Sequence, residues 1–215
     1  MYELLIGTFV TFFVVIDPVG IAPVFAVLTN GASRSFKHRM VFKATLTGGI
    51  ILLFFAFLGT YMLSALGISL PAFKAAGGAL LFMIALDMIF EKRTERREKT
   101  TEGKTHDAEI HEPDENYEDI SVFPIAIPFM AGPGSIATIL LLMSQHSGSR
   151  MEQGLVIAAL FAALLATLII LITATRIIDF LGETVANAIT RILGVILAAM
   201  ATQYMFDGIK AAFLV

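Results

Sequence analysis

Residues 14–25 read "VVIDPVGIAPVF", which sets a carboxylate, two prolines and a glycine inside an apolar run. Residues 127–140, "IPFMAGPGSIATIL", interrupt a second apolar run in a similar way. Proline lacks an N–H and clashes with the preceding helical turn, and glycine frees the backbone. Each stretch therefore predicts a break within a helix, and the fold depends on what surrounds these two breaks.

Composition defines the class of protein. The chain is 57% hydrophobic and 15% charged, with a mean hydropathy of +0.81, whereas about a quarter of the residues of a soluble domain are charged. Residues 91–120 contain 17 of the 33 charged residues, so the remainder is nearly uncharged over long runs. This pattern predicts an integral membrane protein. The absence of Cys excludes disulfides and thiolate metal sites, and the scattered bases predict no nucleic-acid partner.

Six apolar segments are each near the ~20 residues that cross a bilayer as a helix, so we expect an all-α polytopic membrane protein. The segments are 4–28, 41–63, 71–90, 122–143, 154–175 and 185–207. The first segment is expected to stay in the membrane rather than be cleaved as a signal, because residues 1–16 contain no Lys or Arg and no small-x-small site precedes Asp17.

The segments also repeat along the chain. A shift of 115 places Pro18 over Pro133, and a shift of 117 places Gly77 over Gly194. Three spans per repeat is an odd number, so the second copy is expected to be inverted in the membrane, as in many transporters. The predicted units are a first three-helix repeat, a charged and disordered linker, and a second three-helix repeat, at residues 1–90, 91–120 and 121–215.

Lys and Arg are unequally shared between the two sides of the predicted membrane. If all six segments span, the connections one–two, three–four and five–six share a side and hold 12 of the 15 bases. The positive-inside rule then puts both termini outside the inner (plasma) membrane and linker 91–120 in the cytoplasm. If segments one and four were re-entrant hairpins the count would again be 12, so both arrangements stay open.

The two breaks are predicted to form one site. Pro18 and Pro133 lie near the middle of their segments, where a freed N–H or C=O group costs several kcal/mol unless something satisfies it. A single proline would favour a simple kink, but two breaks at matching repeat positions favour a substrate site. The candidate binding residues are Asp17, Pro18, Gly20, Gly132, Pro133, Gly134 and Ser135.

Asp17 has three interpretations. A carboxylate near the bilayer centre costs at least ~2.5 kcal/mol on insertion scales. It can cap the N–H groups of the following half-helix, relay a coupling proton or cation, or contact a substrate ammonium. All three stay open at this point.

Other polar residues in the apolar segments are weaker candidates. Three residues near segment ends are expected to extend towards the headgroups, namely Lys74, Arg191 and Asp207, whereas Asp87 is expected to extend there or pair near the cytoplasmic surface. Five residues either line a polar path or bond helix backbone, namely Thr45, Thr47, Thr138, Thr202 and Gln203.

Two glycine pairs and two histidines of the linker are assigned no binding role. Gly48-Gly49 and Gly77-Gly78 are expected to allow close helix packing. His106 and His111 lack the tight spacing of metal ligands, so no metal site is expected.

The motifs "IDPVGIAPVF" and "PFMAGPGSIATILLL", separated by a charged linker in a chain of six apolar segments, resemble the MarC family. The resemblance covers essentially the whole chain. It implies an inner-membrane, cofactor-free transporter of the wider LysE-like exporter group, and the family includes neutral amino acid transporters. The family pattern matches Asp17, Pro18, Gly20 and Pro23 in the first motif, and Pro128, Ala131, Gly132, Pro133 and Gly134 in the second.

Two positions depart from that pattern. Val19 and Ile21 stand where many members have Pro and Asn. If that Asn contacts substrate in those members, the specificity of this chain differs from theirs.

Several functional classes remain in competition. The favoured one is a secondary transporter of small neutral amino acids, with a proton or sodium ion as the coupling partner. A channel or a structural membrane scaffold is the alternative, followed by drug or metabolite efflux. An intramembrane aspartyl protease is least favoured, because Asp17 and Asp87 lack the Gly-x-Gly-Asp context, so we expect no enzyme activity. The sequence does not specify the oligomeric state.

Overall fold

The computed structural model describes residues 1–29, 31–90 and 121–213, and within them the regular structure is entirely helical. The elements are α1 (Tyr2–Ile16), α2 (Pro18–Leu28), α3 (Arg34–Ala65), α4 (Leu70–Ile89), η1 (Ser121–Met130), α6 (Pro133–Gln145), α7 (Arg150–Ile172) and α8 (Ala174–Phe213). Five helical stretches of the described chain are long and apolar enough to cross a membrane, with α1 and α2 counted together as Tyr2–Leu28. The number is six if the bent pair η1–α6 is one span. The prediction of an all-α polytopic membrane protein is confirmed.

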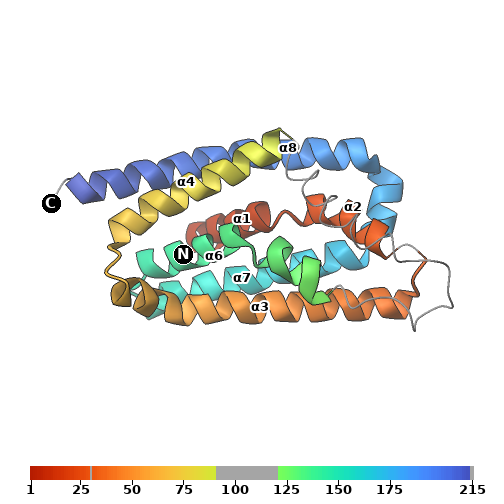
Figure 1. Ribbon diagram of the computed structural model, residues 1–215, viewed down its shortest axis with the longest axis horizontal. Helices are drawn as coiled ribbons and strands as arrows, with labels where there is room; N and C mark the ends of the chain where they lie inside the picture. Colours follow the sequence, from red (N-terminus) through yellow and green to blue (C-terminus); the bar gives the residue numbers. More distant parts are fainter. Residues whose placement is uncertain (30, 91–120, 214–215) are drawn as a thin grey trace.

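The helices run roughly along one axis, and the N-terminus and the end of α8 lie towards the same end of the bundle (Figure 1). The connections α3–α4 and α6–α7 lie at that end too, whereas the α2–α3 and α7–α8 connections lie at the other. This separation of the chain's turns into two ends is what a six-segment membrane bundle requires.

Serine caps decide where three helices begin. The Ser33 Oγ accepts a hydrogen bond from the backbone N–H of Phe36 at 3.1 Å, so α3 begins at Arg34 rather than at the predicted residue 41. Ser69 and Ser149 cap α4 and α7 in the same way. A Ser Oγ satisfies an N–H that a helix start would otherwise leave without a partner.

Helix α8 differs from the prediction at its start. Residues 176–184 were predicted as a connection, but they belong to α8, whose helical course is interrupted at Gly182 (φ 73, ψ 158). Glycine has no Cβ, so it adopts this positive φ without steric penalty. The long apolar part of the helix follows this break, at Thr184–Phe213.

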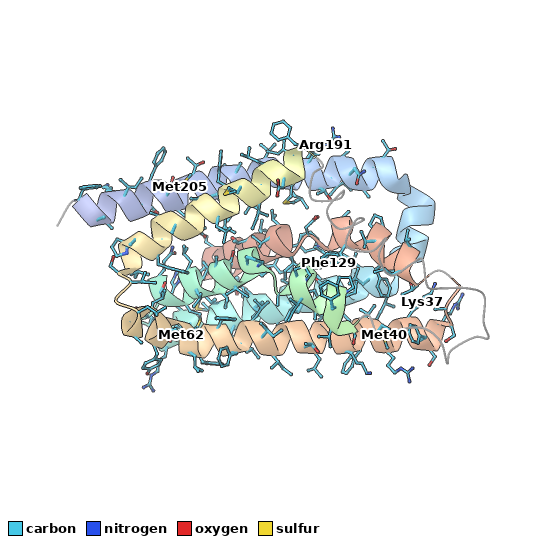
Figure 2. The ribbon with its side chains drawn as sticks, in the orientation of Figure 1. Lys37, Met40, Met62, Phe129, Arg191 and Met205 are labelled. Atoms are coloured by element: carbon cyan, nitrogen blue, oxygen red, sulfur yellow. The ribbon has the colours of Figure 1, made fainter. Side chains whose placement is uncertain are left out.

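Helices α4 and α8 pack closely along one edge of the bundle (Figure 1). A Cβ at Gly78 would lie 2.8 Å from the Ala201 carbonyl oxygen and the Met205 amide nitrogen, which leaves no room for a side chain. Gly194 of α8 meets the Cβ of Met88 in the same way, at 2.9 Å. Figure 2 shows Met205 on α8 where this helix runs beside α4. The prediction that glycine permits close helix packing is confirmed for helices α4 and α8.

Helix α3 lies along the opposite edge and packs on η1 and α7. A Cβ at Gly48 would lie 3.2 Å from the Met130 Cβ, and one at Gly49 would lie 3.2 Å from the Leu164 Cδ1. Phe129 of η1 is 4% exposed and lies inside the bundle (Figure 2). The Gly48-Gly49 pair therefore serves close packing, as predicted.

The apolar core consists of two clusters that meet at α1. Phe12 and Ile16 belong to the cluster formed with α2, α3, η1, α6 and α7, whereas Val14 and Val15 belong to the cluster formed with α4 and α8. Because α1 buries side chains in both directions, it lies between two packed bodies. The first break, which ends α1, is therefore in the interior of the protein.

The predicted linker 91–120, with His106 and His111, lies outside the described residues. The inverted relation between residues 1–90 and 121–215 stays a prediction.

Candidate functional site

Asp17 forms the first break. Its φ and ψ are 56° and 61°, the left-handed region, and it is the one non-glycine residue with a positive φ in the described chain. Asp is among the few residue types that adopt this region readily. The left-handed turn ends α1, and Pro18 starts α2 directly after it, as suits a residue without an N–H.

The Asp17 carboxylate is fully buried and caps α2. Its Oδ1 accepts a hydrogen bond from the Gly20 backbone N–H at 3.1 Å. Capping, one of the three roles considered for Asp17, is therefore present in the structure. It does not exclude the other two, because a carboxylate offers about four lone-pair positions.

Thr190 of α8 makes a second bond to the same atom. Its hydroxyl donates to Asp17 Oδ1 at 3.1 Å, and Thr190 is 3% exposed. Sequence reasoning missed this residue, because 173 positions separate the two partners and no local pattern links them. The only available signal was a hydroxyl next to Arg191 inside an apolar helix. The bond ties the first break to α8.

The second break is more irregular than predicted. The fourth segment was expected to be helix on both sides of the break, but η1 contains extended backbone at Phe123 and Ile127. Each precedes a proline, Pro124 or Pro128, and a residue before proline is forced from helical towards extended conformations. The wide turn closes with a hydrogen bond from the Ala131 N–H to the Ala126 carbonyl at 2.8 Å, across five residues. The axes of η1 and α6 differ by 54°.

Gly132 makes this bend sterically feasible. A Cβ there would collide with the Pro128 carbonyl oxygen, so only glycine fits. Gly132 is the residue before α6, and α6 begins at Pro133 without a side-chain cap from the described residues. The backbone N–H groups of a helix start carry a partial positive charge. The second break thus offers an uncapped helix N-terminus, whereas the first is capped by a carboxylate.

The two breaks approach each other through Gly134. A Cβ on Gly134 would lie 3.2 Å from the Val15 Cγ1 and 2.6 Å from the Ile84 Cδ1, so α6 begins directly against α1 and α4. Ser135 beside it is 2% exposed. Pro133, by contrast, is exposed. Gly134, rather than Pro133, is turned towards α1.

The seven candidate residues therefore divide as follows. Six are buried near the breaks, and these are Asp17, Pro18, Gly20, Gly132, Gly134 and Ser135. Pro133 shapes the start of α6 from the outside. Their binding role stays a prediction.

Lys74 and Asp207 correct one expectation. Both were expected to extend separately to the headgroups, but the Lys74 Nζ lies 3.2 Å from the Asp207 Oδ2. Asp207 Oδ1 also accepts a bond from the Gln203 amide at 2.8 Å. The pair joins the start of α4 to the last turns of α8, because the antiparallel packing of these helices brings the two ends together.

The threonines differ in how they bond. The hydroxyls of Thr11 and Thr202 donate to the carbonyl four residues earlier, the usual arrangement in membrane helices. Thr45 and Thr138 are exceptions, since their buried Oγ1 atoms have no hydrogen-bond partner among the described residues. Thr138 is fully buried, one turn after Gly134.

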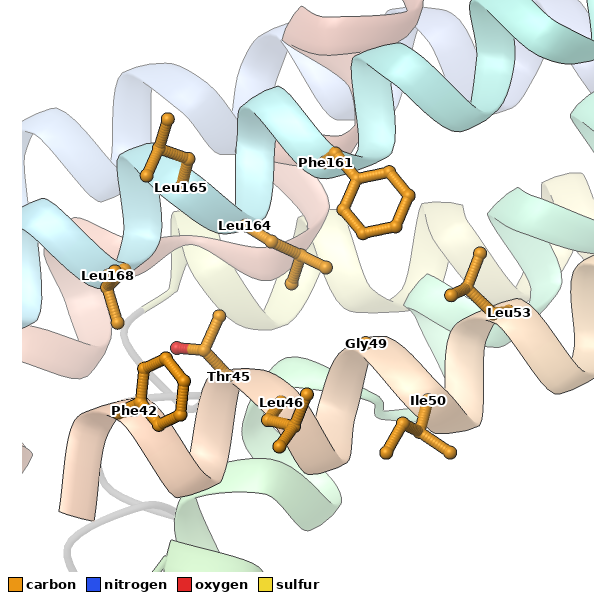
Figure 3. A pocket seen from close by; sticks show the side chains of 10 residues that line it. All are labelled: Phe42, Thr45, Leu46, Gly49, Ile50, Leu53, Phe161, Leu164, Leu165 and Leu168. Atoms are coloured by element: carbon orange, nitrogen blue, oxygen red, sulfur yellow. The ribbon is translucent and has the colours of Figure 1, made fainter. Parts of the chain in front are cut away.

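The groove that Figure 3 shows is a separate feature. It lies between α3 and α7, has a volume of about 240 Å³, and is lined almost wholly by aliphatic and aromatic side chains. Phe42, Leu46 and Leu165 line it and are more than half exposed. None of the seven candidate binding residues borders it, whereas Thr45 does. In residues 1–29, 31–90 and 121–213 no three His, Asp or Glu side chains gather as metal ligands.

Comparisons with known proteins agree with this architecture. A family model described as MarC family integral membrane protein matches residues 2–213. A UPF0056 membrane protein of Pyrococcus horikoshii is 35% identical over 201 residues, which cover 94% of this chain and 92% of the relative. The UPF0056 membrane protein YvbG of Bacillus subtilis is 32% identical over 213 residues, covering 99% and 97%. No solved structure matches the chain.

The family match extends over both breaks and over residues 91–120 between them. Each relative is matched over nearly its whole length, so the similarity concerns the complete helical bundle rather than one segment. The chain is an integral, multi-pass membrane protein that belongs to the MarC family.

Proposed function

We propose that the protein is a secondary transporter that moves small neutral amino acids across the inner membrane through a site between the two helix breaks. The observation that carries the proposal is the pairing of these breaks in the interior. One presents the buried Asp17 carboxylate, and the other presents the uncapped N-terminus of α6, which begins against the end of α1.

This pair of groups suits a small zwitterion. The N-terminus of α6 is the positive end of a helix dipole and favours a carboxylate. Asp17 favours an ammonium, because a buried carboxylate attracts an opposite charge. The broken helices of known transporters bind substrate and coupling ions with the same elements.

The surroundings of the site favour a small, neutral side chain. Ile21 and Ala22 follow the first break and are fully buried, and Ala137 follows the second and is 6% exposed. Apolar residues of this kind offer a charged side chain no partner, and burying an unpaired charge is costly. The proposal includes a coupling proton or sodium ion at Asp17, and no cofactor or catalytic activity.

The orientation proposed is that of the positive-inside rule, with both termini outside and linker 91–120 in the cytoplasm. The fold supports full crossing of the first segment. Tyr2–Leu28 is long and apolar enough to span, and α1 and α2 follow one another from one end of the bundle towards the other (Figure 1).

The test is flux of labelled amino acids into proteoliposomes under imposed proton and sodium gradients. We expect saturable, gradient-driven uptake of at least one small neutral amino acid. Flux that rises linearly with concentration would indicate a channel, and no flux with any amino acid would overturn the substrate assignment.

A double substitution tests whether the second break is the site. Gly132→Leu with Pro133→Leu favours continuous helix and should abolish flux while the protein remains in the membrane. Gly154→Leu is the matched control, because it adds the same side chain at an exposed helical glycine with nothing within 4 Å. Wild-type flux in the double variant would remove the site from this position.

A further inference from the structure

The two halves of the bundle differ in polarity along the broken segments. Towards the end of the bundle that holds the N-terminus, α1 carries the buried hydroxyls of Thr8 and Thr11, and α6 carries polar side chains at Ser135, Thr138 and Gln145. Towards the other end, residues 18–28 ("PVGIAPVFAVL") and 122–131 ("VFPIAIPFMA") contain no side-chain nitrogen or oxygen atom. The apolar half is tightly filled, since Ile21, Phe25, Ile125 and Phe129 are at most 4% exposed.

The polar residues of α6 share one face. Ser135, Thr138 and Gln145 are three and seven positions apart, which brings them within about a quarter turn of each other around the helix. Ser135 is 2% exposed, Thr138 is fully buried and the Gln145 Nε2 atom is buried, so this face points into the protein rather than to the surface. The stripe begins at the second break and ends where α6 ends.

Two polar atoms on this face have no protein partner. Thr138 Oγ1 and Gln145 Nε2 are buried and unbonded among the described residues. Leaving a buried hydroxyl or amide N–H unpaired is destabilising. Thr11, in contrast, bonds the carbonyl of Gly7. Unpaired groups inside a membrane protein are tolerated where another polar species reaches them.

Helix α1 lies opposite this stripe. Val15 meets Gly134 at the break, and Thr11 and Thr8 lie one and two turns back from Val15 on the same face of α1. The polar groups therefore line both sides of the seam between α1 and α6, next to the boundary between the two apolar clusters.

We propose that this seam is the path by which solute passes between the site and the end of the bundle that holds the N-terminus, with Thr138 as its first polar contact. The inference rests on the transport function proposed above. It adds the route that the solute takes and the end of the bundle to which that route leads. In the described conformation the seam is closed, because Thr138 is fully buried, and the apolar half closes the opposite route.

The test uses the absence of Cys from the natural sequence. Single cysteines are placed at Thr138 on the seam and at Ile139, which is equally buried but belongs to the apolar cluster beside α3 and α7. A third, at the exposed Gly148 between α6 and α7, marks the side of the membrane. Each is treated with a charged, membrane-impermeant methanethiosulfonate reagent on intact cells and on inverted vesicles.

We expect Thr138→Cys to react from the side that labels Gly148→Cys, at least tenfold faster than Ile139→Cys. No reaction from either side, reaction from the opposite side only, or a rate equal to that of Ile139→Cys would each overturn the proposal. If Thr138→Cys does not reach the membrane, Thr11→Cys and Gln145→Cys test the same seam with the same outcomes. Labelling requires no knowledge of the solute, so a labelled seam without amino acid flux would refute the proposed substrate while the path stands.

Discussion

Replacing Asp17 with Asn separates the role of a cap from the role of a charge. Asn keeps an oxygen that can accept from the Gly20 N–H and the Thr190 hydroxyl, and it adopts the left-handed backbone of position 17 as readily as Asp. Ala keeps none of these features. Comparison of the two variants therefore assigns a measured loss either to structure or to charge.

The structure gives a magnitude for each variant. Asp17→Ala loses a helix cap worth about 1 kcal/mol and an interhelical hydrogen bond worth about 0.6 kcal/mol in a membrane. It also adds about 1–2 kcal/mol of left-handed strain, so its total loss is on the order of 3 kcal/mol. Asp17→Asn keeps the cap and the interhelical bond and adds no left-handed strain. We therefore expect its thermal midpoint in detergent to stay close to that of the natural protein.

Transport is expected to respond differently. If Asp17 couples an ion or contacts the substrate ammonium, Asp17→Asn should lower gradient-driven flux at least tenfold, which corresponds to ~1.4 kcal/mol in a barrier. Flux is measured in proteoliposomes at equal protein content. Asp207→Asn is the matched control, because it removes an acid from the ion pair with Lys74 near the end of α8, and its flux should change far less.

The result that would refute this reasoning is normal, gradient-sensitive flux by a stable Asp17→Asn protein. Asp17 would then serve only as the cap of α2. Loss of both stability and flux in Asp17→Asn would contradict the expected equivalence of Asp and Asn as caps at this position.

Three further predictions concern packing, topology and the bond to Asp17. Gly78→Ala should destabilise the protein by about 1–3 kcal/mol in thermal unfolding, because its Cβ would overpack the contact between α4 and α8. Gly154→Ala is the control: nothing lies within 4 Å of the added Cβ, so this variant should stabilise the protein by about 0.5–1 kcal/mol. Thr184→Cys should be labelled by an impermeant thiol reagent only from the cytoplasmic side, whereas labelling from outside would establish re-entrant hairpins. Thr190→Val should lower stability by about 0.6 kcal/mol, and at most about 1.7, through loss of its bond to Asp17; an unchanged thermal midpoint would mean that the bond is not made.

The sequence by itself determined the fold class and the positions of the breaks. Apolar runs of about 20 residues specify membrane helices because the bilayer has one thickness, and Pro and Gly act on the backbone within one turn. The Asp17–Pro18 break and the close packing of Gly48-Gly49 and Gly78 follow from such local rules. The resemblance to the MarC family was likewise carried by short motifs.

Only the tertiary structure decided which residues meet across the bundle. The bond between Thr190 and Asp17, the ion pair of Lys74 with Asp207 and the contact of Gly134 with Val15 each join residues distant in the sequence. Periodicity reports which face of a helix is apolar, but not which helix covers that face, because many neighbours satisfy the same pattern. The extended residues of η1 also came from the structure, although their cause is local: the steric effect of Pro124 and Pro128 on the residue before each.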